Sequence, residues 1–261
     1  MVFRRVLTVW LIAVAVCSAS ESSRIVGGQA TTIEKHPSVV QVESITGLIW
    51  SQSCAGSILN TRYVLSAAQC FSGLLFSPSR RRIRAGTANR NRGGVILAVS
   101  RAFNHPTFST STLEGDLTIV QLSTAFVYGK TIQPGRIVTQ NFVFPDDLPV
   151  TQVGWGSTRT SGRGTASVLR EVQVYTANRQ ICAQEHASVS ARPTVSENML
   201  CTGVLGEGGR DACDGDEGGP VYYDDIIIGI ISWRRRCGNA TQPSVNTRVA
   251  SYTNWIIINA S

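Results

Sequence analysis

The sequence predicts an all-β protein, built as antiparallel barrels or as a sandwich, and three observations carry this prediction. The chain of 261 residues contains 24 glycines, which favours turn-rich β architecture over helical bundles. Short segments rich in β-branched residues recur along the chain, and several of them alternate between apolar and polar side chains. Clusters of glycine, asparagine, proline and serine separate these segments. A chain of this length has room for one large domain or two small ones.

Seven segments have the composition of strands, and one segment near the end has that of a helix. In chain order the strands are expected at residues 38–44, 63–68, 95–100, 117–122, 149–155, 168–175 and 226–233. The helix is expected at residues 250–260. The last of the strands is strongly apolar, but it is too short to cross a bilayer and is interpreted as a buried strand.

The N-terminus has the features of a secretory signal peptide. Arg4 and Arg5 precede an apolar run at residues 6–16, and small residues up to Ala19 offer a cleavage site. We therefore expect a signal peptide at residues 1–19 and a soluble, secreted, extracellular protein that does not associate with membranes. Six cysteines follow this segment. An even number in a secreted chain implies three disulfides, although spacing alone allows fifteen pairings.

Charge is unevenly distributed along the chain, whose formal net charge is +7. No acidic residue lies between Ser44 and Leu113, whereas this span holds eight arginines, six of them at residues 80–92. One interpretation is a surface that binds a polyanion such as a sulfated glycan or a nucleic acid. The alternative is a solvated loop and strand face, which the absence of aromatic residues from the run favours.

Arginine is strongly preferred to lysine, which occurs only as Lys35 and Lys130. Arginine keeps its charge far above pH 10, where lysine begins to lose its own. This preference suits an alkaline compartment, and codon bias is the alternative explanation.

Seven short motifs occur in a fixed order. They are RIVGGQ (24–29), SAAQC (66–70), GDLTIVQL (115–122), GWG (154–156), NMLCTG (198–203), DACDGDEGGP (211–220) and GIISW (229–233). Together they resemble the trypsin-like serine proteases of the chymotrypsin fold, from Arg24 to the C-terminus. The segments SILNTRYVLSAA, RRIRAGT and FNHP resemble more narrowly the midgut trypsins of moths and butterflies, which indicates an alkaline gut lumen.

The resemblance implies two six-stranded antiparallel β-barrels, with an active cleft between them and a C-terminal helix. It assigns residues 20–24 to an activation propeptide, 25–130 to the first barrel, 131–249 to the second barrel and 250–261 to the helix. It also implies the disulfides Cys54–Cys70, Cys182–Cys201 and Cys213–Cys237.

The resemblance further implies activation by proteolysis. The bond between Arg24 and Ile25 matches the cleavage point, where a trypsin-like protease would cut the chain. The new ammonium group of Ile25 would then pair with Asp216, because a buried ammonium without a partner is costly.

Two of the three catalytic positions hold unexpected residues. The reaction of the family uses a serine nucleophile, a histidine base and an aspartate that orients the histidine. In this sequence Asp116 stands at the aspartate position, Gln69 at the histidine position and Glu217 at the serine position. An amide has no basic site near neutral pH, and attack by a carboxylate would give a mixed anhydride that nothing visible in the sequence activates.

These substitutions lead to an expected function and two alternatives. We expect that the chain is not an enzyme but a protease homologue, a monomer that binds a protease, an inhibitor or a substrate-like protein as decoy, cofactor or regulator. The first alternative is an active trypsin-like endopeptidase of digestive proteolysis. The second is a secreted protein that binds anions or glycans.

The two substituted positions are expected to satisfy each other. We predict that the amide of Gln69 donates to the carboxylate of Glu217. The backbone N–H groups of Gly215 and Glu217, which correspond to the oxyanion hole, are expected to bind the same carboxylate.

The specificity pocket is expected to be filled from within the chain. Asp211 matches the aspartate that binds basic substrate side chains, whereas Arg234, Arg236 and Ser244 stand where family trypsins have glycine. We predict that Arg234 folds into the pocket and pairs with Asp211 as a tethered imitation of the substrate, because an isolated buried carboxylate is costly. The alternative is three solvated arginines on an open loop.

Other candidate sites are few. The three histidines, His36, His105 and His186, are expected to lie away from the cleft, with His186 in a surface segment. None has metal-ligand spacing to another histidine or cysteine, so neither a metal nor another cofactor is expected. Asn239 begins an Asn-X-Thr glycosylation sequon in a segment expected to be an exposed loop.

Overall fold

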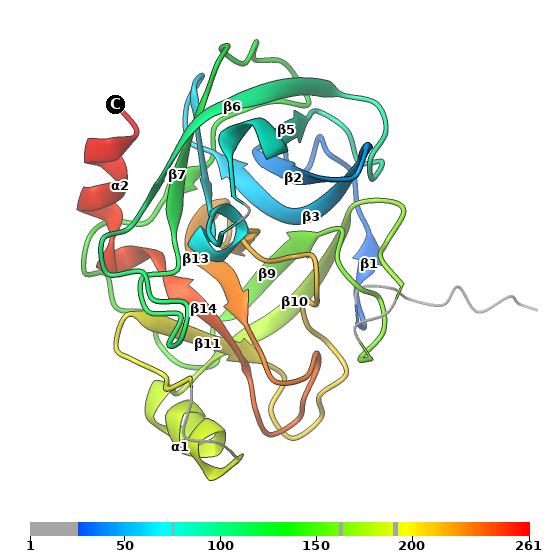
Figure 1. Ribbon diagram of the computed structural model, residues 1–261. Helices are drawn as coiled ribbons and strands as arrows, with labels where there is room; N and C mark the ends of the chain where they lie inside the picture. The colour runs from blue at the N-terminus through cyan, green and yellow to red at the C-terminus, as the bar shows by residue number, and fades with distance from the viewer. Residues whose placement is uncertain (1–25, 75, 162–163, 190–192) are drawn as a thin grey trace, which may run out of the picture.

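Two β-barrels lie one above the other in the computed structural model (Figure 1). The structure describes residues 26–74, 76–161, 164–189 and 193–261. The predicted signal peptide and activation propeptide, and the predicted cleavage point between Arg24 and Ile25, lie outside the described residues. Among the described residues, no helix has the length and apolar character that a membrane crossing requires.

The first barrel is closed by six antiparallel strands, which pair in the order β2-β3-β4-β7-β6-β5. Their bounds are β2 Val39–Thr46, β3 Ile49–Ile58, β4 Tyr63–Ser66, β5 Arg81–Ala85, β6 Val95–Asn104 and β7 Thr118–Leu122. Side chains alternate across each strand, so residues such as Ile83, Leu97 and Ile119 point inward and form the buried core of this barrel.

The second barrel also closes with six strands, in the order β10-β11-β14-β13-β12-β9, because β9 pairs back with β10. Their bounds are β9 Pro149–Gly154, β10 Arg170–Ala177, β11 Met199–Gly203, β12 Pro220–Tyr223, β13 Ile226–Trp233 and β14 Ser244–Arg248. Two short strands extend this sheet: β1 (Gln29–Ala30) pairs with β10, and β8 (Arg136–Ile137) pairs with β13. The segment that precedes the first barrel in the chain is therefore attached to the second.

The C-terminal helix α2 (Thr253–Asn259) lies within the predicted range and follows a short 3-10 turn. A second helix, α1 (Arg179–Val189), was not predicted. Its sequence lacks a broad apolar stripe, since Cys182 and His186 are its only buried residues. The overlooked signal is its N-cap, because the side chain of Asn178 accepts hydrogen bonds from the first N–H groups of the helix.

Three disulfides join loops and a helix to the two sheets. Cys54–Cys70 ties β3 to a 3-10 turn, Cys182–Cys201 ties α1 to β11, and Cys213–Cys237 ties the two loops that flank β12 and β13. These are the pairs that the sequence resemblance implies. Cys54–Cys70 holds the segment that contains residue 69, and Cys213–Cys237 links the segments that contain residues 217 and 234.

Candidate functional site

Gln69 lies in the 3-10 turn Ala68–Phe71 and contacts the aspartate beside it. Its side-chain amide donates to Asp116 Oδ2 (2.6 Å) and to the carbonyl oxygen of Ser232 (2.9 Å), while its backbone N–H donates to Asp116 Oδ1 (2.9 Å). The predicted bond from Gln69 to Glu217 is therefore wrong. Asp116 is fully buried, so its carboxyl group requires hydrogen-bond donors nearby. The side-chain amide of Gln69 is one of these donors and therefore binds Asp116.

Ser232 is a member of this site that sequence reasoning missed. Its hydroxyl donates to Asp116 Oδ2 at 2.6 Å, so it and Gln69 share one carboxylate oxygen. Burial raises the pKa of Asp116, although these donors partly oppose the rise. The available signal was the GIISW motif itself, whose serine precedes the buried Trp233.

Glu217 is held by two groups of its own half of the cleft. Its Oε2 accepts the backbone N–H of Gly215 at 2.8 Å, which is one of the two oxyanion-hole contacts that the sequence analysis expected. Its Oε1 accepts from Arg234 Nη1 at 2.8 Å. Asp214 Oδ1 lies 3.5 Å from the same nitrogen. Glu217 therefore faces Arg234, and its side chain is only 18% exposed.

Arg234 folds inward, with 4% of its side chain exposed, but its partner differs from the one predicted. The predicted ion pair with Asp211 is wrong, because Asp211 Oδ2 instead accepts from the hydroxyl of Ser244 (2.6 Å) and the N–H of Gly238 (3.0 Å). Glu217 offers the guanidinium a second carboxylate at hydrogen-bond distance, and Arg234 binds there. Burial raises the pKa of Asp211, and the charge of Arg234 partly opposes this.

The alternative of three solvated arginines is also wrong for Arg234, whereas Arg236 is exposed. Arg235 is half-buried and donates to the carbonyl oxygen of His186 (3.3 Å). Of these three arginines, Arg234 has a buried side chain, Arg235 is half-buried and Arg236 is exposed.

Asp216 is fully buried and accepts two backbone N–H groups, from Gly156 (2.7 Å) and Cys213 (3.0 Å). The GWG motif makes room for it, since a Cβ atom at Gly154 would collide with Asp216 Oδ1. Burial raises the pKa of Asp216 to about 7. Its predicted partner, the ammonium of Ile25, lies outside the described residues.

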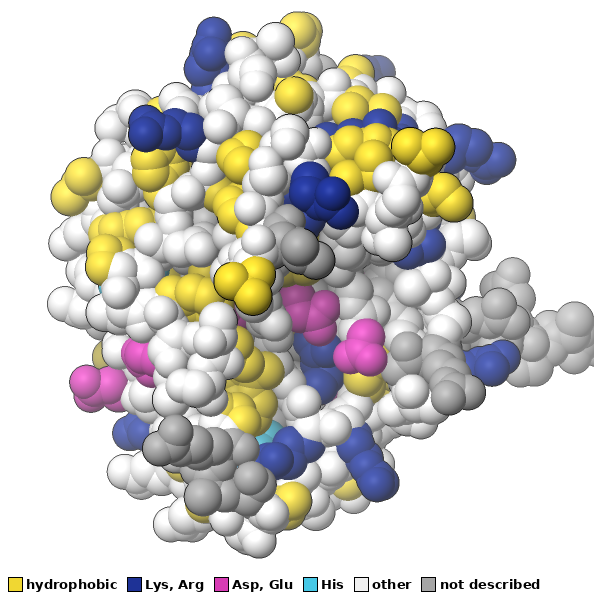
Figure 2. All heavy atoms as spheres, in the orientation of Figure 1, with side chains coloured by type: hydrophobic (Ala, Val, Ile, Leu, Met, Phe, Trp, Pro, Cys, Tyr) yellow, Lys and Arg dark blue, Asp and Glu magenta, His cyan; other side chains and the backbone are white. Residues whose placement is uncertain are grey.

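A cavity of about 760 Å³ opens beside Arg234. Its lining comprises Thr160, Ser161, Asp214, the segment 234–238 and Asn239. In Figure 2, acidic side chains stand at a hollow near the centre of this face, with basic side chains beneath them and along the lower margin. Asn239, expected in an exposed loop, is half-buried at this cavity, and its side-chain oxygen accepts from the backbone N–H of Thr241 (2.9 Å).

The arginine run at residues 80–92 has a structural role at two of its positions. Arg82 and Arg84 each donate to one oxygen of the fully buried Glu43, at 2.5 Å. Arg82 also stacks over the ring of Trp50, 4.4 Å from its centroid. The aromatic partner that the run itself lacks therefore comes from strand β3, which is separated from β5 by β2 in the barrel.

The three histidines take part in contacts elsewhere. His36 bonds to Glu171 (2.7 Å), and His105 packs edge-on against Tyr252 and Trp255. His186 is buried rather than on the surface, and its Nε2 lies 2.8 Å from the carbonyl oxygen of Pro243. Within the described part of the chain, the groups that bond to the side chains at the three triad positions are therefore not imidazoles.

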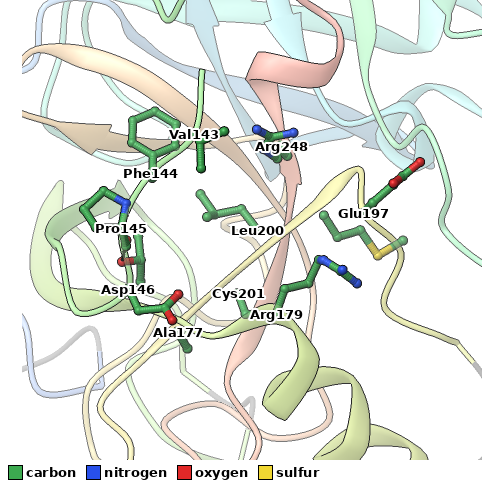
Figure 3. A pocket seen from close by; sticks show the side chains of 12 residues that line it. Val143, Phe144, Pro145, Asp146, Ala177, Arg179, Glu197, Leu200, Cys201 and Arg248 are labelled. Atoms are coloured by element: carbon green, nitrogen blue, oxygen red, sulfur yellow. Dashed lines mark hydrogen bonds between the residues drawn. The ribbon is translucent and has the colours of Figure 1, made fainter. Parts of the chain in front are cut away.

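A second pocket of about 270 Å³ lies on the second barrel (Figure 3). Its apolar part includes Val143, Phe144 and Leu200, and the charged side chains of Arg179 and Glu197 lie at its edge. None of the residues predicted for the cleft lines it, so it is a separate feature of the surface.

Comparisons with known proteins agree on the family. The family model described as Trypsin matches residues 25–256. Trypsin CFT-1 of Choristoneura fumiferana is 39% identical over 97% of this chain and 100% of its own length. Trypsin, alkaline A, of Manduca sexta is 40% identical over 89% of this chain and 90% of its own length. Achelase-1 of Lonomia achelous is 35% identical over 90% of this chain and 100% of its own length.

These comparisons contradict the expectation that the chain is not an enzyme. Four relatives at 39–40% identity, which cover most of the chain, are named trypsins. The expectation depended on the side chains of Gln69 and Glu217. The similarity to relatives named trypsins contradicts it, so it is wrong.

Proposed function

Because the chain belongs to the trypsin family, we propose that it is a secreted trypsin-family protein that binds a protein partner through the cleft between its barrels. The observation that carries this proposal is the ion pair between the buried Arg234 and Glu217, which lies at the serine position on the second-barrel side of the cleft. Each charged group is held by the other, and Gln69 is held by Asp116. The cleft therefore offers a partner a preorganised, charged surface.

The surroundings of this ion pair suit protein recognition. The cavity beside Arg234 has polar and charged walls, and arginine is enriched among the residues that dominate binding energy in protein interfaces. The disulfides Cys54–Cys70 and Cys213–Cys237 fix the loops on both sides of the cleft. A fixed surface loses little conformational entropy when it binds. The partner can be a protease, an inhibitor or a substrate-like protein, with this chain as decoy, cofactor or regulator.

A second candidate function is trypsin-like endopeptidase activity in digestion. The names of the relatives favour it, and so does the fully buried Asp211 at the position that binds basic side chains in the family. This function requires a nucleophile and a base at the cleft other than the serine and histidine of the family's reaction.

Secretion and processing belong to the same proposal. All six cysteines of the described residues form disulfides, which persist in oxidising extracellular compartments. The preference for arginine and the relatives named as alkaline trypsins favour an alkaline gut lumen. We further propose that a trypsin-like protease cuts after Arg24 and that the chain acts as a monomer.

Site-directed cross-linking tests the binding function. A photo-reactive amino acid is placed at Ser161, on the cavity margin, and as a matched control at the exposed Ser100 on β6. The proposal predicts that protein from the secreting tissue is cross-linked at Ser161 and not at Ser100. The same preparation, cut after Arg24, is assayed with an arginine amide. Hydrolysis at the rate of a named relative, without capture at Ser161, would establish the second candidate function instead.

A further inference from the structure

The two halves of the chain differ sharply in charge. Residues 25–130, which include the first barrel, contain ten lysines and arginines and four acidic residues, a formal net charge of +6. Residues 131–261 contain eleven arginines and twelve acidic residues, a formal net charge of −1. In Figure 2, basic side chains stand on the upper part of the face, over the first barrel, whereas the acidic side chains lie at its middle and below. A surface with one sign of charge attracts polyions of the opposite sign.

Six arginines of the first barrel carry this excess. Three other basic groups are already paired, since Lys35 binds Glu171 and both Arg82 and Arg84 bind Glu43. The remaining arginines of this barrel form no ion pair with any described residue. They are Arg62, Arg80, Arg81, Arg90, Arg92 and Arg101.

Two of these six arginines are held in place by neutral oxygen atoms. Arg81 Nε donates to the carbonyl oxygen of Cys70 (2.9 Å), and Arg90 donates to the backbone and side-chain oxygens of Gln52 (both 2.8 Å). Such acceptors orient a guanidinium group without cancelling its charge. Burial lowers the pKa of both arginines, and the charge of Arg80 lowers the pKa of Arg81 further.

The held arginines belong to a row across three strands. Arg81 on β5 pairs with Ser44 on β2, which pairs with Ser51 on β3, and the hydroxyl oxygen of Ser51 lies 3.3 Å from Arg90 Nη2. Two strand spacings, about 10 Å, therefore separate Arg81 from the residue that contacts Arg90. The arginines next to them in the sequence are exposed. We call these four residues the basic row: Arg80, Arg81, Arg90 and Arg92.

The other two arginines lie on a different part of the same barrel. Arg101 on β6 pairs with Gln121 on β7, and Gln121 pairs on its other side with Tyr63, which follows Arg62. Both arginines are exposed. The unpaired charge is thus distributed over the barrel surface, where a small anion would contact one group and a linear polyanion would contact several at once.

The aromatic rings near these arginines narrow the class of polyanion. The guanidinium groups of Arg81 and Arg101 lie over the rings of Phe76 and Phe103, 5.8 Å and 5.4 Å from their centroids. Single-stranded nucleic acids gain affinity by stacking bases on open aromatic rings, so rings that are covered by arginines favour a polyanion without bases. A guanidinium group binds two oxygens of one oxyanion and keeps its charge at alkaline pH, and sulfate esters remain ionised there too.

We propose that the first barrel binds a sulfated glycan, with its sulfate groups along the basic row and a second contact at Arg62 and Arg101. This function is separate from binding at the cleft, because none of the six arginines lines the cavity beside Arg234. It also gives a role to the arginines of the acid-free span that do not bind Glu43.

The test uses heparin as the sulfated glycan and chemically desulfated heparin, which keeps its carboxylates, as the matched probe. Titration calorimetry with the full chain measures both affinities at several salt concentrations. We expect heparin to bind at least about tenfold more tightly than the desulfated polymer, and its log Kd to change with log salt with a slope of about 3 or more, as the neutralisation of several charges requires. Equal affinities of the two polymers would overturn the inference.

Paired variants locate the site. Arg80→Gln/Arg92→Gln removes the two exposed charges of the basic row and should weaken heparin about tenfold, or about threefold for each exposed ion pair, and reduce the salt slope by about 2. The control Arg136→Gln/Arg179→Gln removes two exposed charges from the second barrel and should leave the slope unchanged. Equal losses in the two double variants would show attraction by net charge only and would overturn the site.

Two further polyanions test the class of ligand at the same salt concentration. Oligothymidylate and poly-glutamate of matched charge should each bind at least about tenfold more weakly than heparin, since the first lacks open rings to stack on and the second lacks sulfate. Oligothymidylate that binds as tightly as heparin would assign the surface to single-stranded nucleic acid. Poly-glutamate that binds as tightly would show a surface without preference for sulfate, and either result would overturn the glycan assignment.

Discussion

The two barrels accommodate buried carboxylates in different ways. In the first barrel, Glu43 is bound by the guanidinium groups of Arg82 and Arg84 from the adjacent strand β5. In the cleft, the buried aspartates accept from neutral groups: Asp116 from an amide, a hydroxyl and a backbone N–H, and Asp216 from two backbone N–H groups. The first arrangement compensates the carboxylate with positive charge, whereas the second provides hydrogen bonds without positive charge.

This difference in partners indicates different roles for the buried carboxylates of the first barrel and of the cleft. A carboxylate that is fully paired by arginines completes the framework and has nothing further to bind. A carboxylate that is held by neutral donors keeps the proton more readily, and burial raises the pKa of both Asp116 and Asp216. Among the described residues, buried polar atoms without a hydrogen-bond partner also include Nε and Nη2 of Arg234 and Oδ1 of Asp211.

The largest predicted effect breaks the neutralisation in the first barrel. Glu43→Gln would leave Arg82 and Arg84 with uncompensated charge against a buried amide, and should lower the free energy of unfolding by about 3–5 kcal/mol. Urea unfolding measures it. The matched control is Glu34→Gln, at an exposed glutamate, which should change the value by less than about 0.5 kcal/mol. A loss for Glu43→Gln as small as that of the control would show that the arginines are solvated.

The sequence shows the residues of both regions but not how they pair. Strand periodicity and turn residues are local signals, so they predicted an all-β chain. The two barrels were implied by the resemblance of the ordered motifs to the trypsin-like proteases. The choice of partner by Gln69 and Arg234 depends on a few ångströms between loops far apart in the chain. Each side chain binds a different carboxylate from the one predicted. Gln69 binds Asp116 rather than Glu217, and Arg234 binds Glu217 rather than Asp211.

Helix α1 was missed for a related reason. Its two buried residues are a disulfide-bonded cysteine and a histidine rather than an apolar stripe, so hydrophobic periodicity could not find it. The role of Glu43 was missed as well, although a lone acid opposite a strand of arginines is a pattern that cross-strand pairing could have indicated.

The second prediction concerns pH and the buried Asp216. Its folded-state pKa, about 7, lies above the ordinary value of about 3.9, so the folded state holds a proton that the unfolded state has released. The stabilisation from this group is complete below about pH 4 and is lost as the pH rises through about 7. The total is up to about 4 kcal/mol in the uncleaved chain.

Asp216→Asn should remove this part of the pH dependence. Urea unfolding across the same pH range should give a flatter curve for the variant, while Asp147→Asn, at an exposed aspartate, should leave the curve of the native chain unchanged. Because Glu217 and Arg234 also face Asp216, the comparison is one of slopes rather than of absolute stability. Parallel curves for Asp216→Asn and the native chain would mean that Asp216 is not the titrating group.

The third prediction tests Arg234 as the cation of the cleft. In the double variant Gln69→His/Glu217→Ser, Arg234 loses Glu217 and should turn to Asp211, which fills the specificity position. Adding Arg234→Gly should then raise kcat/KM for an arginine ester by about 100-fold, or about 2.7 kcal/mol. Adding Arg236→Gly instead should raise it less than about tenfold, because that side chain is already exposed. Equal gains from the two additions would contradict a blocking role for Arg234.

The smallest predicted effect is the loss of one neutral donor. Gln69→Ala removes the amide bond to Asp116, but the hydroxyl of Ser232 and the backbone N–H of residue 69 still donate to the same carboxyl group. The free energy of unfolding, measured in urea, should fall by about 1–2 kcal/mol, the usual cost of one lost hydrogen bond at a buried group. Gln133→Ala, which removes an exposed amide that donates to a carbonyl oxygen, should cost less than about 0.5 kcal/mol.

The size of this loss decides whether the contrast between the barrels holds. A loss for Gln69→Ala that equals that of Glu43→Gln would mean that a single neutral donor matters as much as two arginines, and the contrast would disappear. A loss of about 1–2 kcal/mol would mean that the cleft distributes the solvation of its charge over several weak donors. Each of these donors could then be replaced by a ligand, whereas neither arginine at Glu43 could.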